Sequence, residues 1–155
     1  MKKTITVILF LWVFIISAGC GTLPRTISKG VLDYKSIKHG FSLTFPQSWE
    51  GKYFVTENGR ELSVSHKTDL KRDANFFTIY IFNTKDEWEK FDKVFGPDIG
   101  LKKIYEKDST VFVITYPTDY PYGIDDDAKY AQEFEKMKQD IPEIEKSFTC
   151  INKRY

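Results

Sequence analysis

The chain has 155 residues, enough for one domain behind a short targeting segment. Its 23 lysine and arginine residues nearly balance its 22 aspartate and glutamate residues, and the two signs are interspersed along the sequence. This balance excludes the strongly basic face of most nucleic-acid-binding domains, so we expect no nucleic-acid partner. Hydrophobic residues make up 41% of the chain, with 13 Phe among them, which suffices for one packed core.

The first twenty residues are typical of a bacterial signal peptide. Two lysines precede the apolar run ITVILFLWVFII at residues 5–16, which is shorter than the roughly 20 residues that span a bilayer. Three small residues, SAG, then lead directly to Cys20. Small residues before a cleavage point are what a signal peptidase requires.

The stretch SAGC, residues 17–20, resembles the lipobox of bacterial lipoproteins, although Ser17 stands where leucine is commonest. The resemblance implies that residues 1–19 are a signal peptide and that the thiol of Cys20 carries a lipid. The acyl chains would then hold the protein on the extracytoplasmic face of the cell membrane. Two alternatives stay open: the N-terminal segment is an uncleaved anchor, or cleavage occurs elsewhere and Cys20 is incidental.

Residues 20–32 are expected to be the lipidated cysteine and a tether, because GTLPRTISKGVL contains a proline, two glycines and no sustained hydrophobic period. A single domain is expected over residues 33–155. Its first clear element is the alternating stretch GFSLTFP, residues 40–46, which predicts a half-buried strand.

Two more extended regions follow. The stretch KYFVTENGRELSVSH, residues 52–66, predicts a hairpin with a type I′ turn at Asn58-Gly59. Residues 75–83, NFFTIYIFN, are apolar or aromatic on both faces, which indicates a central strand covered on both sides.

A helix is predicted next, because TKDE at residues 84–87 has the spacing of a capping box, and Gly96-Pro97 is expected to end it. A second hairpin is expected to turn at Asp108-Ser109.

The last predicted helix carries one apolar stripe from Tyr130 to Phe148, which keeps its register across Pro142. Because proline breaks a helical hydrogen bond, the helix is expected either to kink there or to restart as a second short helix capped by Asp140.

Four stretches together resemble small lipoproteins of Gram-positive bacteria with a PsbP-like domain: GFSLTFPQSW, TIYIF, VFVITYPTDY and EFEKMKQDIPEIEKSF. The resemblance covers most of residues 34–149. It implies an α/β/α sandwich that serves as a non-enzymatic binding or scaffolding domain. Together with the hairpins, it leads us to expect an α+β fold, with an antiparallel sheet of five to seven strands and two main helices packed on it.

No stretch carries a catalytic or metal-binding motif. His39 and His66 have no metal-ligand spacing and are expected to be ordinary surface or strand-end residues. The run Asp125–Asp127 could, with Asp119, hold Ca²⁺, but acidic residues at a helix start are better explained as caps. Cys150 is expected at the edge of the core. We therefore expect no catalytic residue, no cofactor and no metal site.

The loop TYPTDYPYGI, residues 115–124, is the candidate binding surface. Tyrosine alternates with proline in it, which could make a rigid amphipathic patch for a protein, glycan or peptide. The candidate residues of this Tyr/Pro patch are Asp119, Tyr120, Pro121 and Tyr122. The alternative is that the loop simply packs on its own sheet.

These observations favour a lipid-anchored, non-catalytic binding or scaffolding domain at the cell envelope. Its partner would be an envelope protein or glycan. The alternative is an accessory enzyme or a small-solute-binding lipoprotein that uses a cleft between the sheet and the C-terminal helix.

The lipobox resemblance predicts the outcome of fractionating cells that express Cys20→Ala. Without the thiol that accepts the lipid, we expect the variant in the medium, whereas the wild type and the control Cys150→Ala sediment with membranes. Globomycin, which inhibits the lipoprotein signal peptidase, should cause the unprocessed wild-type precursor to accumulate. Unchanged membrane retention of Cys20→Ala would count against the anchor.

Overall fold

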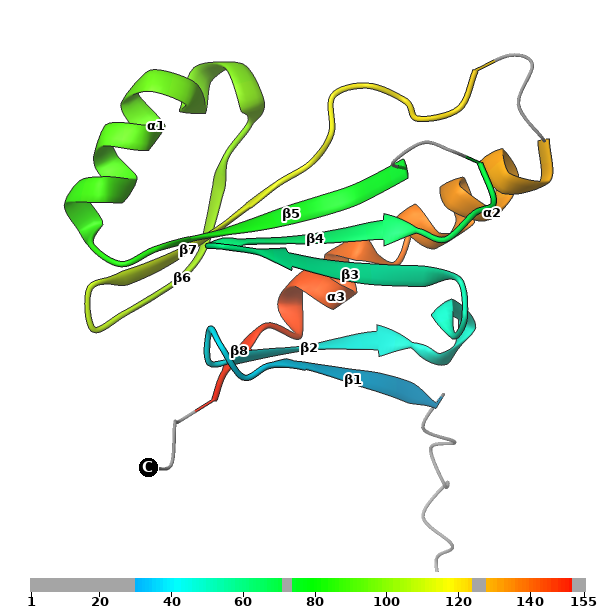
Figure 1. Cartoon of the computed structure of the whole chain (residues 1–155), viewed down its shortest axis with the longest axis horizontal. Helices are drawn as coiled ribbons and strands as arrows, with labels where there is room; N and C mark the ends of the chain where they lie inside the picture. The colour runs from blue at the N-terminus through cyan, green and yellow to red at the C-terminus, as the bar shows by residue number, and fades with distance from the viewer. Residues whose placement is uncertain (1–29, 71–73, 124–127, 152–155) are drawn as a thin grey trace, which may run out of the picture.

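The computed structural model describes residues 30–70, 74–123 and 128–151, and the expected α+β class is confirmed (Figure 1). The described strands are β1 (Val31–Ser36), β2 (Phe41–Pro46), β3 (Tyr53–Asn58), β4 (Glu61–His66), β5 (Ala74–Phe82), β6 (Lys102–Lys107), β7 (Thr110–Thr115) and β8 (Thr149–Cys150). The described helices are the short 3-10 helix η1 (Gln47–Trp49), α1 (Lys85–Ile99), α2 (Ala128–Lys138) and α3 (Ile141–Lys146).

The strands divide between two antiparallel sheets, where the sequence predicts one. The three-stranded sheet has the order β1-β2-β8, and the five-stranded sheet has the order β3-β4-β5-β7-β6. Pro46 ends β2, and η1 then leads the chain from the first sheet to the second. β1 begins at Val31, so the last two residues of the predicted tether lie in a strand.

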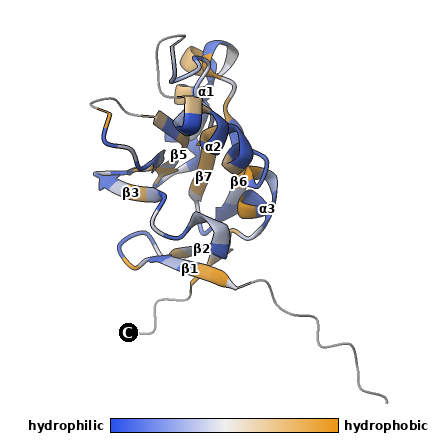
Figure 2. Cartoon of the chain, turned by 90° about the vertical axis from the view of Figure 1, so that its right-hand side faces the viewer, coloured by the Kyte–Doolittle hydropathy of each residue, from blue (hydrophilic) through white to orange (hydrophobic). Residues whose placement is uncertain are grey.

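β5 is the middle strand of the five-stranded sheet, as its two-sided apolar pattern predicts. Phe77 and Ile79 belong to the main core, which the three-stranded sheet, α2 and α3 complete. Tyr80 and Phe82 belong to a smaller cluster with Trp88 and other side chains of α1 and β7. Figure 2 shows this arrangement from the side, with α1 at one end of the molecule and β1 and β2 at the other.

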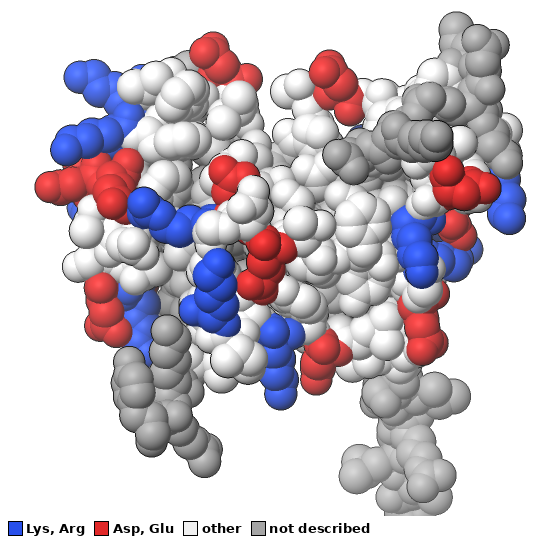
Figure 3. Space-filling view, in the orientation of Figure 1, with Lys and Arg blue, Asp and Glu red and all other residues white. Residues whose placement is uncertain are grey.

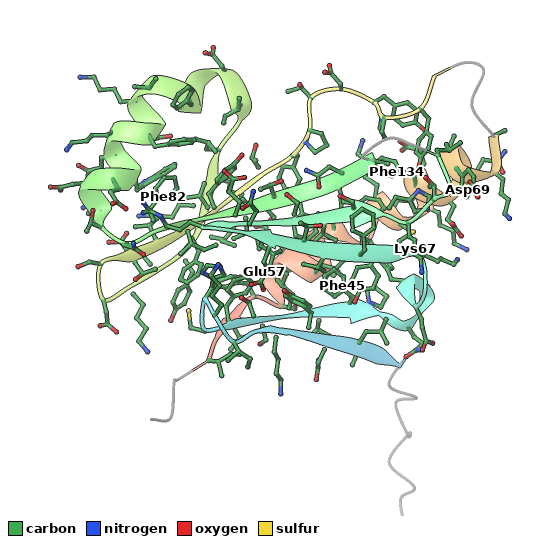
Figure 4. All side chains as sticks on the ribbon, viewed as in Figure 1. Phe45, Glu57, Lys67, Asp69, Phe82 and Phe134 are labelled. Atoms are coloured by element: carbon green, nitrogen blue, oxygen red, sulfur yellow. The ribbon has the colours of Figure 1, made fainter. Side chains whose placement is uncertain are left out.

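The main core contains aromatic rings from both sheets. Figure 4 shows Phe45 between the two sheets and Phe134 on α2. Trp49 is 0% exposed and lies against Phe45, Tyr53 and Phe76, with ring centroids 4.7–5.7 Å apart. Each such ring contributes a large buried apolar area, so η1 is fixed firmly to the core.

The C-terminal stripe is divided into two helices, so the restart at Pro142 is confirmed. The predicted capping role of Asp140 is wrong, because its side chain makes no capping hydrogen bond to α3. Its backbone is already helical, and its carboxylate accepts a hydrogen bond from the Trp49 indole Nε1 at 3.0 Å. Asp140 therefore joins the start of α3 to η1.

α1 begins as predicted, with the Thr84 hydroxyl accepting a hydrogen bond from the Glu87 N–H at 3.2 Å. The predicted end at Gly96-Pro97 is wrong, since the helix continues to Ile99 and ends at Gly100 with φ +58°. The Thr115 hydroxyl donates to the Ile99 carbonyl at 2.7 Å, which satisfies one of the free carbonyls at the helix end and ties α1 to β7.

Both predicted hairpins form, but only one has the predicted turn. At Asp108-Ser109 both φ angles are positive, 49° and 71°, as a type I′ turn requires. In the other hairpin Asn58 pairs with Glu61, so the central residues are Gly59 and Arg60. Of these two only Gly59 has a positive φ, the pattern of a type II′ turn.

Ser109→Gly should raise the free energy of unfolding by about 1 kcal/mol, because a left-handed backbone conformation strains a residue that has a side chain. Lys107→Gly, in the neighbouring strand, should lower it by about 0.5–1 kcal/mol. Urea denaturation of the full chain measures both values. A loss of stability in Ser109→Gly similar to that of Lys107→Gly would contradict the turn geometry.

Candidate functional site

The structure separates the four residues of the predicted Tyr/Pro patch. Asp119, Tyr120 and Pro121 line a small cavity of about 160 Å³ beside Phe134. Tyr120 is 49% exposed, whereas Tyr122 is directed into the core and is only 5% exposed. Of the two candidate tyrosines, therefore, only Tyr120 is available at the surface, and a binding role for this loop stays a prediction.

Tyr122 belongs to a buried chain of hydrogen bonds. Its hydroxyl bonds to Nδ1 of His66, while Nε2 of His66 lies 3.1 Å from Oε2 of Glu133. Lys52 Nζ lies 2.8 Å from the other carboxylate oxygen, and its hydrogen bond lowers the pKa of Glu133 against the opposing effect of desolvation. Because an ionised carboxylate only accepts, Nε2 of His66 donates to Glu133, and in the neutral imidazole that carries this proton Nδ1 accepts from the Tyr122 hydroxyl.

The order hydroxyl–imidazole–carboxylate is also that of a nucleophile with its base and orienting acid. The His66 side chain, however, is 0% exposed and is surrounded by the rings of Phe76, Tyr122, Tyr130 and Phe134. These rings leave no room for a substrate beside the imidazole, so the network joins β4, α2 and the loop before α2. His66 is the last residue of β4, as the strand-end prediction has it, but it is not a surface residue, because α2 and this loop cover the end of β4.

A groove lies on the other face of the five-stranded sheet, beside α1. Its larger part has a volume of about 730 Å³ and is lined by Asn58, Gly59, Arg60, Glu61, Tyr80, Ile81, Phe82, Glu87, Lys90 and Phe91. A second hollow of about 270 Å³ is lined by Phe54, Thr56, Asn58, Glu61, Ser63, Ser65 and Asn75. Asn58 and Glu61 line both, so the two hollows adjoin, and together they are called the α1–sheet groove below.

Strand register explains why these side chains share one face. Thr56 pairs with Ser63, Ser63 pairs with Thr78, and Glu61 pairs with Tyr80. Directly paired residues point to the same side of a sheet, and side chains alternate along each strand. The face opposite the main core is therefore polar over β3 and β4 and aromatic where β5 meets α1.

The wall of the groove beside α1 combines aromatic rings with an ion pair. Tyr80 and Phe91 have ring centroids 5.8 Å apart, and Arg60 Nη1 lies 2.6 Å from Glu87 Oε2. Burial and the nearby Glu61 carboxylate raise the pKa of Tyr80, so its hydroxyl stays protonated. Figure 4 shows Phe82 at the end of β5 beside α1, and this residue also lines the groove.

The polar side chains of the open part of the floor carry hydroxyl and amide groups and the Glu61 carboxylate. Ser63 Oγ lies 3.0 Å from Thr78 Oγ1, and Asn75 Nδ2 donates to the same Thr78 oxygen at 2.9 Å. Within the described ranges, no donor reaches the buried Oδ1 of Asn75. Figure 3 shows acidic and basic side chains interspersed on this view, and an area over β3–β5 that carries neither.

The other expected sites are partly outside the structure. Cys20 and the run at 125–127 lie outside the described residues, and within those residues no group of three or more His, Cys, Asp or Glu side chains could hold a metal ion. Cys150 lies in β8 against the main core, as expected, and burial raises the pKa of its thiol.

The α1–sheet groove is not among the sites predicted from the sequence. A signal was present: polar residues recur at every second position of β3 and β4, at Thr56 and Asn58 and again at Ser63 and Ser65. Such alternation also marks any solvent-facing side of a sheet, so only the adjacent aromatic wall from α1 distinguishes a groove.

Comparisons with known proteins add no relative. No protein-family model, no curated protein and no solved structure matches the chain. Among the described residues, none of the helices has the length and apolar character needed to cross a membrane.

Tyr122→Phe should lower the free energy of unfolding by about 1–3 kcal/mol, because it removes the hydroxyl that bonds to His66 inside the core. Tyr120→Phe loses only a 3.4 Å contact to the Ala131 carbonyl at an exposed site and should cost less than about 0.5 kcal/mol. Chemical denaturation of both variants tests this difference. Equal losses of unfolding free energy in the two variants would show that the buried network contributes no more to stability than the exposed hydroxyl does.

Proposed function

We propose that this chain is a lipid-anchored, non-catalytic binding domain that works on the extracytoplasmic face of the cell membrane and holds its ligand in the α1–sheet groove. The anchor rests on the lipobox resemblance at residues 17–20. The observation that carries the binding role is the groove, which combines aromatic rings, an ion pair and a polar floor in one open concave surface. Ligand sites typically combine an apolar surface with a few fixed polar groups in this way.

Two features favour binding over catalysis at this groove. Arg60 is already paired with Glu87, and the hydroxyls of Ser63 and Thr78 bond to each other, with Asn75 also donating to Thr78, rather than to a base. The chain of groups that resembles catalytic machinery, around His66, is enclosed in the core on the far side of the sheet. A groove with paired charges and unactivated hydroxyls suits recognition.

The alternative function requires a cleft between the sheet and the C-terminal helix. That space is filled by Phe134, Met137, Ile141 and Ile144, which are at most 6% exposed. The α1–sheet groove is also larger than the cavity beside the Tyr/Pro patch, at about 730 Å³ against about 160 Å³. These comparisons favour the groove as the place of binding.

The proposal is tested by photo-crosslinking in the protein's own cells. A photoreactive p-benzoylphenylalanine is placed at Phe54, which lines the groove and is 41% exposed, or at Tyr120, which is 49% exposed. We expect an ultraviolet-dependent adduct from position 54 of the membrane-bound full chain and none from position 120. An adduct from position 120 alone would move the binding site to the Tyr/Pro patch, and no adduct from either would overturn the binding function.

A further inference from the structure

We infer that the α1–sheet groove binds a segment of an uncharged, hydroxyl-rich glycan chain, an inference that rests on the binding function proposed above. Three physical features of the groove exclude other classes of ligand. A fourth feature, the placement of its aromatic rings, matches the shape of linked sugar rings.

The charge of the groove is balanced. Four charged side chains line it, the basic Arg60 and Lys90 and the acidic Glu61 and Glu87. Arg60 and Glu87 form an ion pair, and Lys90 and Glu61 are of opposite sign, so the four side chains carry no net charge. Because recognition of anions or cations depends on complementary potential, the groove favours a neutral ligand.

The floor over β4 and β5 offers no backbone groups to a peptide, and the unpaired main-chain groups of the edge strand β3 lie in the plane of the sheet rather than on this face. β4 pairs with β3 on one side and β5 on the other, and β5 pairs with β4 and β7. Their N–H and C=O groups are therefore used within the sheet, whereas recognition of an extended peptide depends on free main-chain groups at a sheet edge. A ligand on this floor meets side-chain hydroxyl, amide and carboxylate groups only.

An apolar ligand is also a poor match. It would remove the Thr56 hydroxyl, the Asn58 amide and the Glu61 carboxylate from water without supplying hydrogen bonds, which carries a desolvation penalty. A ligand whose hydroxyls both donate and accept satisfies these groups instead.

The aromatic rings lie at opposite ends of the polar floor. Phe54, 41% exposed, marks one end on β3, and Tyr80 with Phe91 marks the other beneath α1. The floor extends about 13 Å along β3 from Phe54 to Asn58, at about 3.3 Å per residue. The C–H face of a sugar ring packs on an aromatic ring, and this length accommodates linked rings better than a single sugar.

The test is a calorimetric titration of the full chain, purified from membranes in a polyoxyethylene detergent that carries no sugar headgroup. The probes are chitotetraose, cellotetraose and maltotetraose, with the corresponding monosaccharides, a polygalacturonate tetramer and a Ser/Thr-rich hexapeptide as comparisons. We expect at least one neutral tetrasaccharide to bind with a Kd of about 1 mM or tighter and about tenfold more tightly than its monosaccharide.

Two variants locate the binding. Phe54→Ala should weaken binding of that tetrasaccharide about tenfold, whereas Tyr120→Ala, which removes a similarly exposed ring outside the groove, should leave it unchanged. Glu61→Gln, which keeps the shape of the side chain, provides a second groove variant if Phe54→Ala does not fold.

The outcomes separate the two proposals. Binding of the charged tetramer or the peptide in preference to every neutral tetrasaccharide overturns the glycan, and so does an affinity for the monosaccharide equal to that for its tetramer. No binding by any tetrasaccharide, together with a crosslinked adduct from position 54 in cells, overturns the glycan but keeps the binding function. If no tetrasaccharide binds and position 54 gives no crosslinked adduct in cells, both proposals are overturned.

Discussion

The packing of side chains against both faces of β5 is the constraint on which the rest of the structure depends. On one face Phe77 and Ile79 lie in the main core with the three-stranded sheet and α2 and α3. On the other face Phe82 packs against Trp88 of α1, with ring centroids 5.6 Å apart. Because a strand that is apolar on both sides must be covered on both sides, these two layers follow from the composition of β5.

The groove is a geometric consequence of covering a five-stranded sheet with one helix. A helix is about 10 Å wide with its side chains, and neighbouring strands lie about 4.8 Å apart, so one helix covers about two strands. α1 is tied to β7 by the Thr115 hydroxyl and packs on β5 through Phe91, which leaves β3 and β4 open. The residues that face outward there, Thr56 and Ser63, are polar because water reaches them.

Local patterns predicted much of this fold, and long-range contacts decided the rest. The alternation of Phe41, Leu43 and Phe45, the two-sided β5 and the Asp108-Ser109 turn depend on neighbouring residues, so they could be predicted. β8 and the division into two sheets depend on pairing between residues more than a hundred positions apart, as between Phe41 and Cys150.

The α1–sheet groove could not be predicted, also because it depends on long-range contacts. Which strands α1 leaves uncovered is a property of the assembled layers. His66 is buried only because α2 returns to cover the end of β4.

If the α1–sheet groove holds a ligand as proposed, it is occupied when the protein is in its own membrane. Hydroxyl-radical footprinting with mass spectrometry tests this without knowledge of the ligand, since Phe54, Tyr105 and Tyr120 are similarly exposed at 41%, 37% and 49%. For each residue, the oxidation rate in intact cells is divided by the rate in the purified full chain. We expect this ratio to be well below one for Phe54 and close to one for the two tyrosines. A ratio close to one at Phe54, together with a ratio well below one at Tyr120, would contradict occupation of the α1–sheet groove.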